Sequence, residues 1–147
     1  MMRAGDLAAG QVYRSRALPV TRAAITAFAT EFDPQSFHLA DDPDSLFGRQ
    51  IASGWHTAAI TMRLFVEAMP LEGGRVGAGV EALKWLRPVC PGDSLHVQAT
   101  VLRITASRSR PGTAVLVVLI ETFNQNDELV QSMQPTIILR SGAGTPP

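Results

Sequence analysis

Cysteine and lysine each occur only once in this chain. Cys90 is the only cysteine, which excludes an internal disulfide and a zinc site built on paired cysteines. Lys84 is the only lysine, the other basic residues are scattered arginines, and the formal net charge is zero. A nucleic-acid-binding protein would carry a basic stripe, which this sequence lacks. We therefore expect neither a metal site nor a nucleic-acid partner.

Long hydrophobic runs are also missing. The longest apolar run, Ala114 to Ile120, is far too short to cross a bilayer. The N-terminal segment lacks the apolar stretch of a signal peptide, so we expect none. These absences predict a soluble, cytoplasmic protein with no membrane partner.

The composition that remains suits one folded domain. The chain has 147 residues, of which 46% are hydrophobic and 18% are charged. That length and balance allow a real hydrophobic core without disulfides or metals. We expect the domain to span residues 11–140, with a flexible N-terminus at 1–10 and a flexible tail at 141–147, which is rich in glycine and proline.

Hydrophobic periodicity predicts helices in the first half of the chain. The expected elements are a short strand over 11–18, a helix that ends near Thr30, one helical turn over 41–47 and a long helix over 55–68. Thr21 is a good N-cap for the first helix. In the long helix, apolar residues at spacings of three and four cover a wide arc, so we expect most of its surface to be buried: Ala58, Ala59, Met62, Phe65, Val66 and Met69.

The second half of the chain predicts strands instead. Segments rich in β-branched residues or alternating in polarity lie at 76–87, 94–105, 113–124 and 129–139. Their short connections favour antiparallel pairing. Helices followed by strands indicate an α+β domain. We expect a single hotdog fold, in which a curved antiparallel sheet is wrapped around a long central helix.

Three segments resemble the MaoC-like dehydratases and R-specific enoyl-CoA hydratases. In residues 28–38, Asp33 and His38 are separated by four residues in a polar loop after a helix, as in the hydratase motif of that family. Residues 51–56 resemble the small-residue turn that opens its central helix, and residues 86–95 resemble its strand–turn–strand signature. The three segments occur in the family's order.

The sequence departs from the family pattern at both ends of the site. Family hydratases commonly have Asn-Pro between the Asp and the His, whereas here Pro34 follows Asp33 directly and Gln35 stands near the Asn position. The central helix is often opened by His-Gly, whereas this chain has Ser53-Gly54.

The resemblance implies that water is added to a trans-2-enoyl thioester to give a 3-hydroxyacyl thioester. Asp33 and His38 would hold and activate the water. The backbone N–H of Gly54 would polarise the thioester carbonyl, while Ser53 would either bond to the substrate or cap the helix. The substrate would be an acyl-CoA or an acyl-carrier-protein thioester, with coenzyme A a part of the substrate and no separate cofactor.

Other interpretations stay open. Arg108 and Arg110 could contact coenzyme A phosphates or be solvated loop residues, and Asp33 could simply cap the turn at Pro34. A hotdog acyl-CoA thioesterase would attack the carbonyl instead, with an acid on the central helix, where Glu67 is the only late candidate. A third possibility is a non-catalytic subunit that binds acyl thioesters. The resemblance also implies a homodimer or a dimer of dimers, with sites completed across the interface.

Overall fold

The computed structural model describes residues 1–141. Its elements, in chain order, are a 3-10 helix η1 (Ala4–Asp6), β1 (Val12–Arg14), β2 (Leu18–Pro19), α1 (Arg22–Phe32), α2 (Ser36–Leu39), α3 (Gly54–Ala68), β3 (Val76–Trp85), β4 (Ser94–Ala106), β5 (Thr113–Phe123) and β6 (Leu129–Arg140). No helix in this part of the chain has the length and apolar character needed to cross a membrane.

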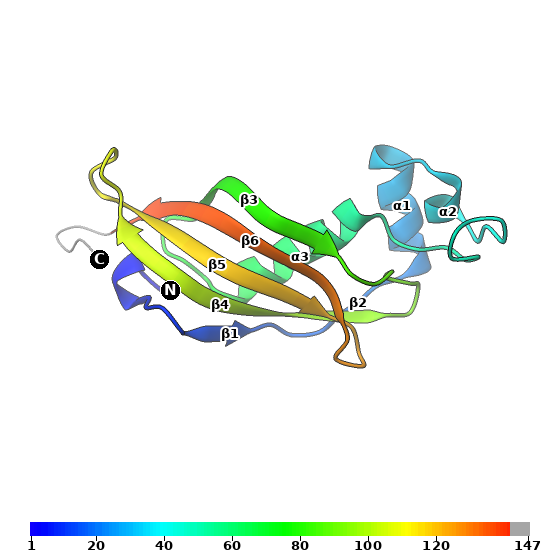
Figure 1. Cartoon of the computed structure of the whole chain (residues 1–147), viewed down its shortest axis with the longest axis horizontal. Helices are drawn as coiled ribbons and strands as arrows, with labels where there is room; N and C mark the ends of the chain where they lie inside the picture. The colour runs from blue at the N-terminus through cyan, green and yellow to red at the C-terminus, as the bar shows by residue number, and fades with distance from the viewer. Residues whose placement is uncertain (142–147) are drawn as a thin grey trace.

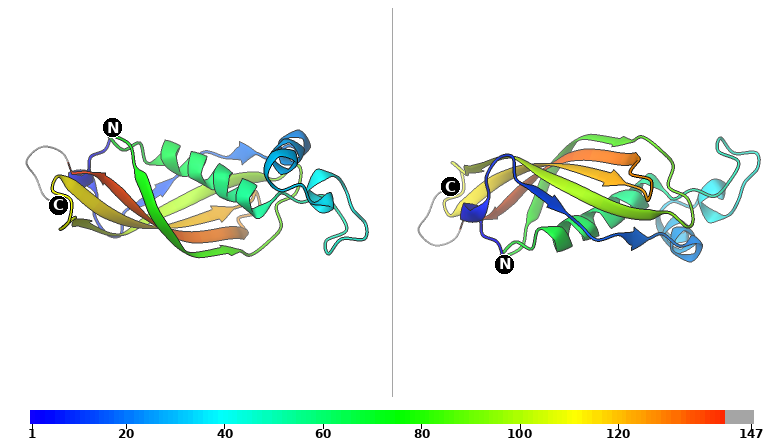
Figure 2. Two further views of the ribbon diagram at one scale, coloured as in Figure 1. Left: turned by 90° about the horizontal axis from the view of Figure 1, so that it is seen from above. Right: turned by 90° about the horizontal axis from the view of Figure 1, so that it is seen from below.

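The strands form one antiparallel sheet. Their order is β1-β4-β5-β6-β3, and β2 pairs separately with β4. The long helix α3 lies along one face of this curved sheet, while α1 and α2 stand together at one end of the molecule (Figures 1 and 2). This arrangement is the hotdog fold, as the sequence predicts.

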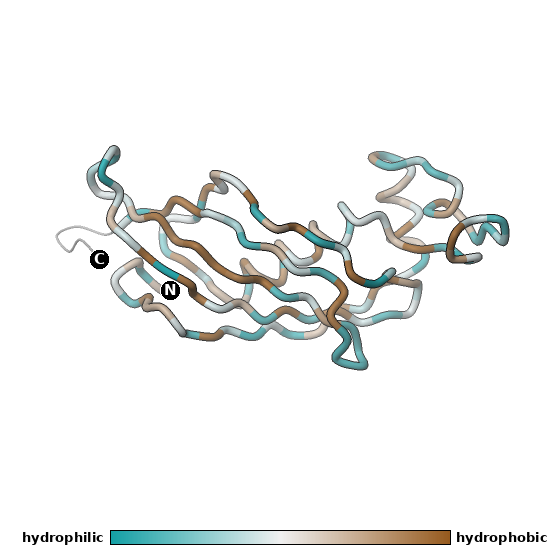
Figure 3. The backbone as a smooth tube through the Cα atoms, in the orientation of Figure 1, coloured by the Kyte–Doolittle hydropathy of each residue, from teal (hydrophilic) through white to brown (hydrophobic). Residues whose placement is uncertain are grey.

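The core lies between α3 and the sheet. Alternate residues of β5 face it, and Leu116, Val118 and Ile120 are fully buried. Leu64 and Phe65 of α3 are fully buried against them. The hydrophobic colouring accordingly follows the central strands in Figure 3. Each strand can place its apolar residues in the core because its side chains alternate between the two faces of the sheet.

The predicted burial of the long helix is wrong on one side. Buried residues form one face of α3: His56, Thr57, Ile60, Thr61, Leu64 and Phe65. Met62 and Val66, which were expected inside, are 40% and 42% exposed, and Ala59 is exposed as well. Hydropathy predicted the wrong buried face of α3 because Thr61, a polar residue, is buried. Its hydroxyl oxygen lies 2.7 Å from that of Thr122, so the two form a hydrogen bond within the core. An apolar stripe is therefore left on the outer side of α3.

The helical turn predicted over 41–47 is also wrong, and the extra helical turn lies earlier, in α2. Residues 41–47 form turns around Asp42. Its side chain accepts a hydrogen bond from the Asp44 N–H at 3.1 Å, and its carbonyl accepts one from the Ser45 hydroxyl at 2.6 Å. Such local bonds compete with helix formation, and Pro43 supplies no N–H.

Residues near the N-terminus, expected to be flexible, are packed against the domain. Ala4 is fully buried and Leu7 is 6% exposed. The N–H of Met2 donates to the carbonyl of Pro70 at 2.9 Å. The strand predicted over 11–18 is divided into β1 and β2. All of the predicted tail except Ser141 lies outside the described residues.

Candidate active site

The connection between α1 and α3 places the acid and the histidine side by side. Helix α1 ends at Phe32 because the residue before a proline is disfavoured in helical conformation. Asp33 therefore becomes its C-cap, and its carbonyl accepts a hydrogen bond from the Gln35 N–H at 2.8 Å. The short helix α2 then turns the chain back. His38 Nε2 comes within 3.3 Å of Asp33 Oδ2.

Three side chains surround the Asp33 carboxylate. Gln35 Nε2 donates to Oδ1 at 2.7 Å, and the Ser53 hydroxyl donates to Oδ2 at 2.7 Å. These two hydrogen bonds, with Ser53 the larger influence, and the adjacent His38 hold the pKa of Asp33 below its ordinary value. Asp33 is thus held as a carboxylate, which is a hydrogen-bond acceptor rather than a donor of protons.

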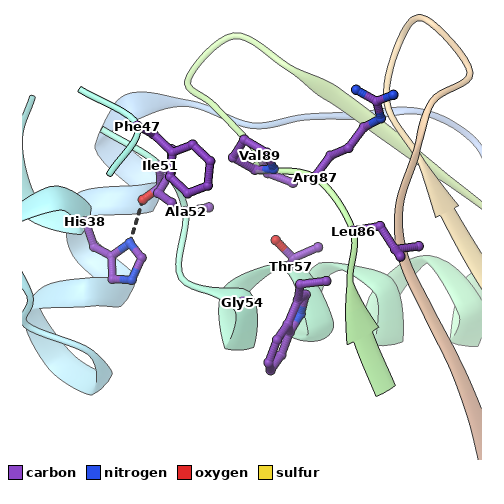
Figure 4. A pocket seen from close by; sticks show the side chains of 11 residues that line it. His38, Phe47, Ile51, Ala52, Gly54, Thr57, Leu86, Arg87 and Val89 are labelled. Atoms are coloured by element: carbon purple, nitrogen blue, oxygen red, sulfur yellow. Dashed lines mark hydrogen bonds between the residues drawn. The ribbon is translucent and has the colours of Figure 1, made fainter. Parts of the chain in front are cut away.

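The ring of His38 has a fixed orientation and a defined tautomer. Its side chain is buried, and Nδ1 lies 2.7 Å from the carbonyl oxygen of Ile51 (Figure 4). A carbonyl can only accept, so Nδ1 carries the hydrogen. Nε2 is left facing Asp33. It can therefore take up or release a proton without any movement of the ring.

The N-terminus of α3 supplies a hydrogen-bond donor near this pair. Ser53 is the N-cap, and its hydroxyl oxygen accepts a bond from the Trp55 N–H at 3.3 Å. Gly54 is the first residue of the helix, so its N–H has no acceptor within α3. The helix dipole adds positive potential at this point, which favours an oxygen that develops negative charge.

One cleft joins the histidine to the helix N-terminus. It has a volume of about 280 Å³ and is lined by His38, Phe47, Ile51, Ala52, Gly54, Thr57, Trp85, Leu86, Arg87, Pro88 and Val89 (Figure 4). Sequence reasoning missed Thr57 and Arg87. Thr57 lies one turn after Gly54 on the same face of α3, which is a signal that could have found it. Arg87 forms an ion pair with Glu128 at 3.0 Å.

A glycine is required at position 54 because Trp85 lies against it. A Cβ at this position would come within 2.6 Å of Cε2 of the indole ring. Trp85 Nε1 donates to the Oε1 atom of the fully buried Gln131 at 2.9 Å, which holds the ring in place. Trp55 meets Trp85 edge to face, with ring centroids 5.2 Å apart. The Trp55 and Trp85 side chains are 60% and 44% exposed.

The structure brings together four of the predicted site residues, namely Asp33, His38, Ser53 and Gly54. Arg108 and Arg110 are not among them. They lie in the connection between β4 and β5, at the opposite end of the molecule from α1 and α2 (Figure 1). Neither arginine is among the residues that line the cleft, and their predicted contact with coenzyme A phosphates stays a prediction.

Other clusters of polar residues offer no metal site. Among residues 1–141, no group of three histidine, cysteine or acidic side chains is arranged to hold a metal ion. The aspartates near position 42 instead serve local turns and the pair with Arg22, whose Nη1 lies 3.2 Å from Asp41 Oδ1. His56 is buried and stacks on Phe28, with ring centroids 4.8 Å apart. Burial lowers the pKa of His56.

Comparison with known proteins finds one family over most of the chain. The family described as "MaoC like domain" matches residues 6–122. A crystal structure of the MaoC-like dehydratase from Rhodospirillum rubrum is 49% identical, with a TM-score of 0.90, and the match covers 95% of this chain and 97% of that one. The uncharacterized protein YdeM of Bacillus subtilis (strain 168) is 32% identical over 143 residues, which cover 95% of this chain and 99% of YdeM.

A more distant structure shares the fold. The R-hydratase PhaJ1 from Pseudomonas aeruginosa is 22% identical, with a TM-score of 0.75, and the match covers 99% of this chain and 94% of that one. At that identity the likeness concerns the fold alone. The family predicted from the three sequence motifs is confirmed by the closer matches.

Proposed function

The chain belongs to the MaoC-like domain family, and from that premise we propose that it is a hydratase/dehydratase acting on a trans-2-enoyl thioester. One observation carries the proposal. His38 lines the same cleft as Gly54, and its Nε2 atom lies 3.3 Å from Oδ2 of the Asp33 carboxylate. A proton-transfer group and a carbonyl-binding N–H thus share one small cavity.

In the proposed hydration, the N–H of Gly54 donates to the thioester oxygen and stabilises the enolate that forms there. A water that lies beside this pair, hydrogen-bonded to both Asp33 and His38 Nε2, attacks the β-carbon. Its oxygen and one hydrogen remain on that carbon, while the other proton passes to Nε2 and then to the α-carbon. Dehydration reverses these steps. All atoms of the added water are thereby accounted for, and no separate cofactor is involved.

The proton passes through His38 rather than Asp33 in this proposal because of the surroundings of the carboxylate. Protonation of Asp33 would weaken the bonds donated by Gln35 and Ser53, and an ionised Asp33 stabilises the protonated ring of His38. Such general acid–base catalysis contributes about 10²–10⁴-fold to a rate. A preorganised oxyanion donor such as Gly54 contributes about 10²–10³-fold.

The main alternative, a thioesterase, needs an acid on the central helix close to the cleft. Glu67 of α3 does not meet that requirement. It lies 13 residues after Gly54, or about 20 Å along the helix. It is held by Arg16 at 2.7 Å and Arg63 at 3.0 Å, which lower its pKa to about 2. The hydratase is therefore the function that the site supports better.

A homodimer, or a dimer of dimers, is part of the proposal. Among residues 1–141, strand β3 has a neighbour on one side only, so within that range its outer edge is unpaired. Val76 and Val80 of β3 are 67% and 52% exposed, and they accompany the apolar stripe of α3. A second copy that covered these surfaces would remove them from water. Light scattering at micromolar concentration should give the mass of a dimer or tetramer, and the 15.8 kDa mass of a monomer would contradict it.

The function is tested with short and medium trans-2-enoyl-CoA substrates. Hydration removes the ultraviolet absorbance of the conjugated enoyl thioester without releasing a thiol. We expect loss of that band with no free coenzyme A. Release of free thiol would replace this proposal by the thioesterase. Saturable binding with neither change would indicate a non-catalytic binding subunit.

A further inference from the structure

We infer that Ser53 is a positioning residue, whose hydroxyl fixes the Asp33 carboxylate relative to the Gly54 amide without contacting the substrate. The inference deepens the proposed function and rests on it for the rate measurements. Its basis is the geometry of one buried hydroxyl group, and of the two roles expected for Ser53 it keeps the helix cap and not the bond to the substrate.

The hydrogen bonds of Ser53 are already used within the protein. Its side chain belongs to a residue that is 1% exposed. A serine hydroxyl has one hydrogen to donate, and that hydrogen goes to Asp33 Oδ2 at 2.7 Å. The oxygen accepts from the Trp55 N–H. No donor on Ser53 is therefore left for a thioester.

The same hydroxyl connects the two halves of the site. Ser53 is the N-cap of α3 and immediately precedes Gly54, the proposed oxyanion donor. Through Asp33 it also reaches the carboxylate that faces His38. Catalytic groups must be held within about 0.5 Å of their working geometry. Since Gln35, the other side chain donating to Asp33, is exposed, Ser53 is the buried of the two supports.

The charge of Asp33 depends on few groups. Among residues 1–141, His38 is the one basic side chain that lies within ion-pair distance of this carboxylate, and it is the one titratable group that acts on the pKa of Asp33. The Ser53 hydrogen bond is the largest cause of the lowered pKa of Asp33. Removal of the hydroxyl should therefore raise that pKa.

The test compares Ser53→Ala, Ser53→Gly and Ser53→Thr with the wild type. Alanine and glycine remove the hydroxyl, but glycine is tolerated at helix N-caps and guards against a folding defect. Threonine keeps the hydroxyl. Ser45→Ala is the matched control, because its hydroxyl bonds to a turn carbonyl at 2.6 Å outside the cleft.

The first readout needs no substrate. The pKa of Asp33 is measured by ¹³C NMR titration of its side-chain carboxyl. It should rise in Ser53→Ala and Ser53→Gly and stay near the wild-type value in Ser53→Thr and Ser45→Ala. An unchanged pKa in both hydroxyl-free variants would overturn the inference, whatever the activity.

The second readout is kinetic. In Ser53→Ala and Ser53→Gly, kcat should fall by roughly 10–100-fold as Asp33 loses its position. The acid limb of the kcat/KM profile should move to higher pH, with KM little changed and recovery in Ser53→Thr. A raised KM with unchanged kcat would show a substrate contact and overturn the inference. The two proposals can fail separately. If the wild type hydrates no enoyl thioester but the Asp33 pKa still rises in the hydroxyl-free variants, the hydratase is refuted and the charge-setting role of Ser53 stands.

Discussion

Alanine at position 54 should destabilise the protein through a single contact. The new Cβ would lie 2.6, 2.7 and 2.9 Å from three atoms of the Trp85 ring, well inside van der Waals contact. Trp85 cannot turn away without breaking its bond to Gln131. Overpacking of this kind costs about 1–3 kcal/mol, while exchanging glycine for alanine in a helix returns roughly 0.5–1 kcal/mol. We expect Gly54→Ala to lower the free energy of unfolding by up to about 2.5 kcal/mol.

A double-mutant cycle separates the contact from the helix. In a Trp85→Ala background the obstruction is gone, so Gly54→Ala should be neutral or stabilising by about 0.5 kcal/mol. Urea denaturation of the four proteins then gives a coupling of about 1–3 kcal/mol, a size usual for residues in contact. An equal effect of Gly54→Ala in both backgrounds would refute the reasoning, because the glycine would then be needed for its backbone and not for the indole.

Three other perturbations test the packing and the charges. Because the pKa of Asp33 is lowered in the folded state, its contribution to stability is complete above the unfolded pKa of about 3.9 and is lost as the pH falls through the folded pKa. Asp33→Asn should therefore lose less stability than the wild type between about pH 5 and pH 3. Parallel acid-denaturation curves for the two proteins would contradict this. Thr61→Val leaves the Nε2 group of Gln131 without its buried acceptor at 3.1 Å and should cost about 1–3 kcal/mol in urea denaturation, so a cost near zero would refute that bond. Leu116→Ala, at a fully buried site, should cost about 2–5 kcal/mol, whereas Leu46→Ala, at a site 91% exposed, should change stability by less than about 0.5 kcal/mol; similar values for both would contradict the assigned core.

Local signals in the sequence were enough to predict most of the fold. Thr21 caps α1 as expected, and its hydroxyl oxygen accepts from the Ala24 N–H at 3.1 Å. The four long strands lie within two residues of their predicted limits. These elements were predictable because caps and alternating polarity act over a few neighbouring residues.

Features that depend on distant contacts were not predictable in the same way. The inward face of α3 depends on Thr61 meeting Thr122 across the core, and hydropathy alone places both residues outside. The packing of the N-terminus depends on Met2 meeting Pro70. Each contact joins segments about 60 or more residues apart, so no local sequence pattern predicts it.

The contacts of the candidate site likewise include some that could be predicted from the sequence and some that could not. The resemblance to the hydratase motif implied that Asp33 and His38 would meet, and the helical turn α2 is what brings them together. Nothing local connects Ser53 to Asp33, or Trp85 to Gly54. Arg108 and Arg110 were chosen for their charge alone, and charge carries no information on which end of the sheet a loop occupies.

The most direct test of the central claim compares two histidines that each lie 3.3 Å from an aspartate. His38 faces Asp33 in the cleft, and His96 faces Asp127 at the edge of a separate pocket. The measurement is kcat/KM for hydration of a short trans-2-enoyl-CoA by His38→Ala, His96→Ala and the wild type, each checked for folding. We predict a loss of about 10²–10⁴-fold in His38→Ala and a wild-type rate in His96→Ala. Hydration that survives in a folded His38→Ala variant would contradict the account.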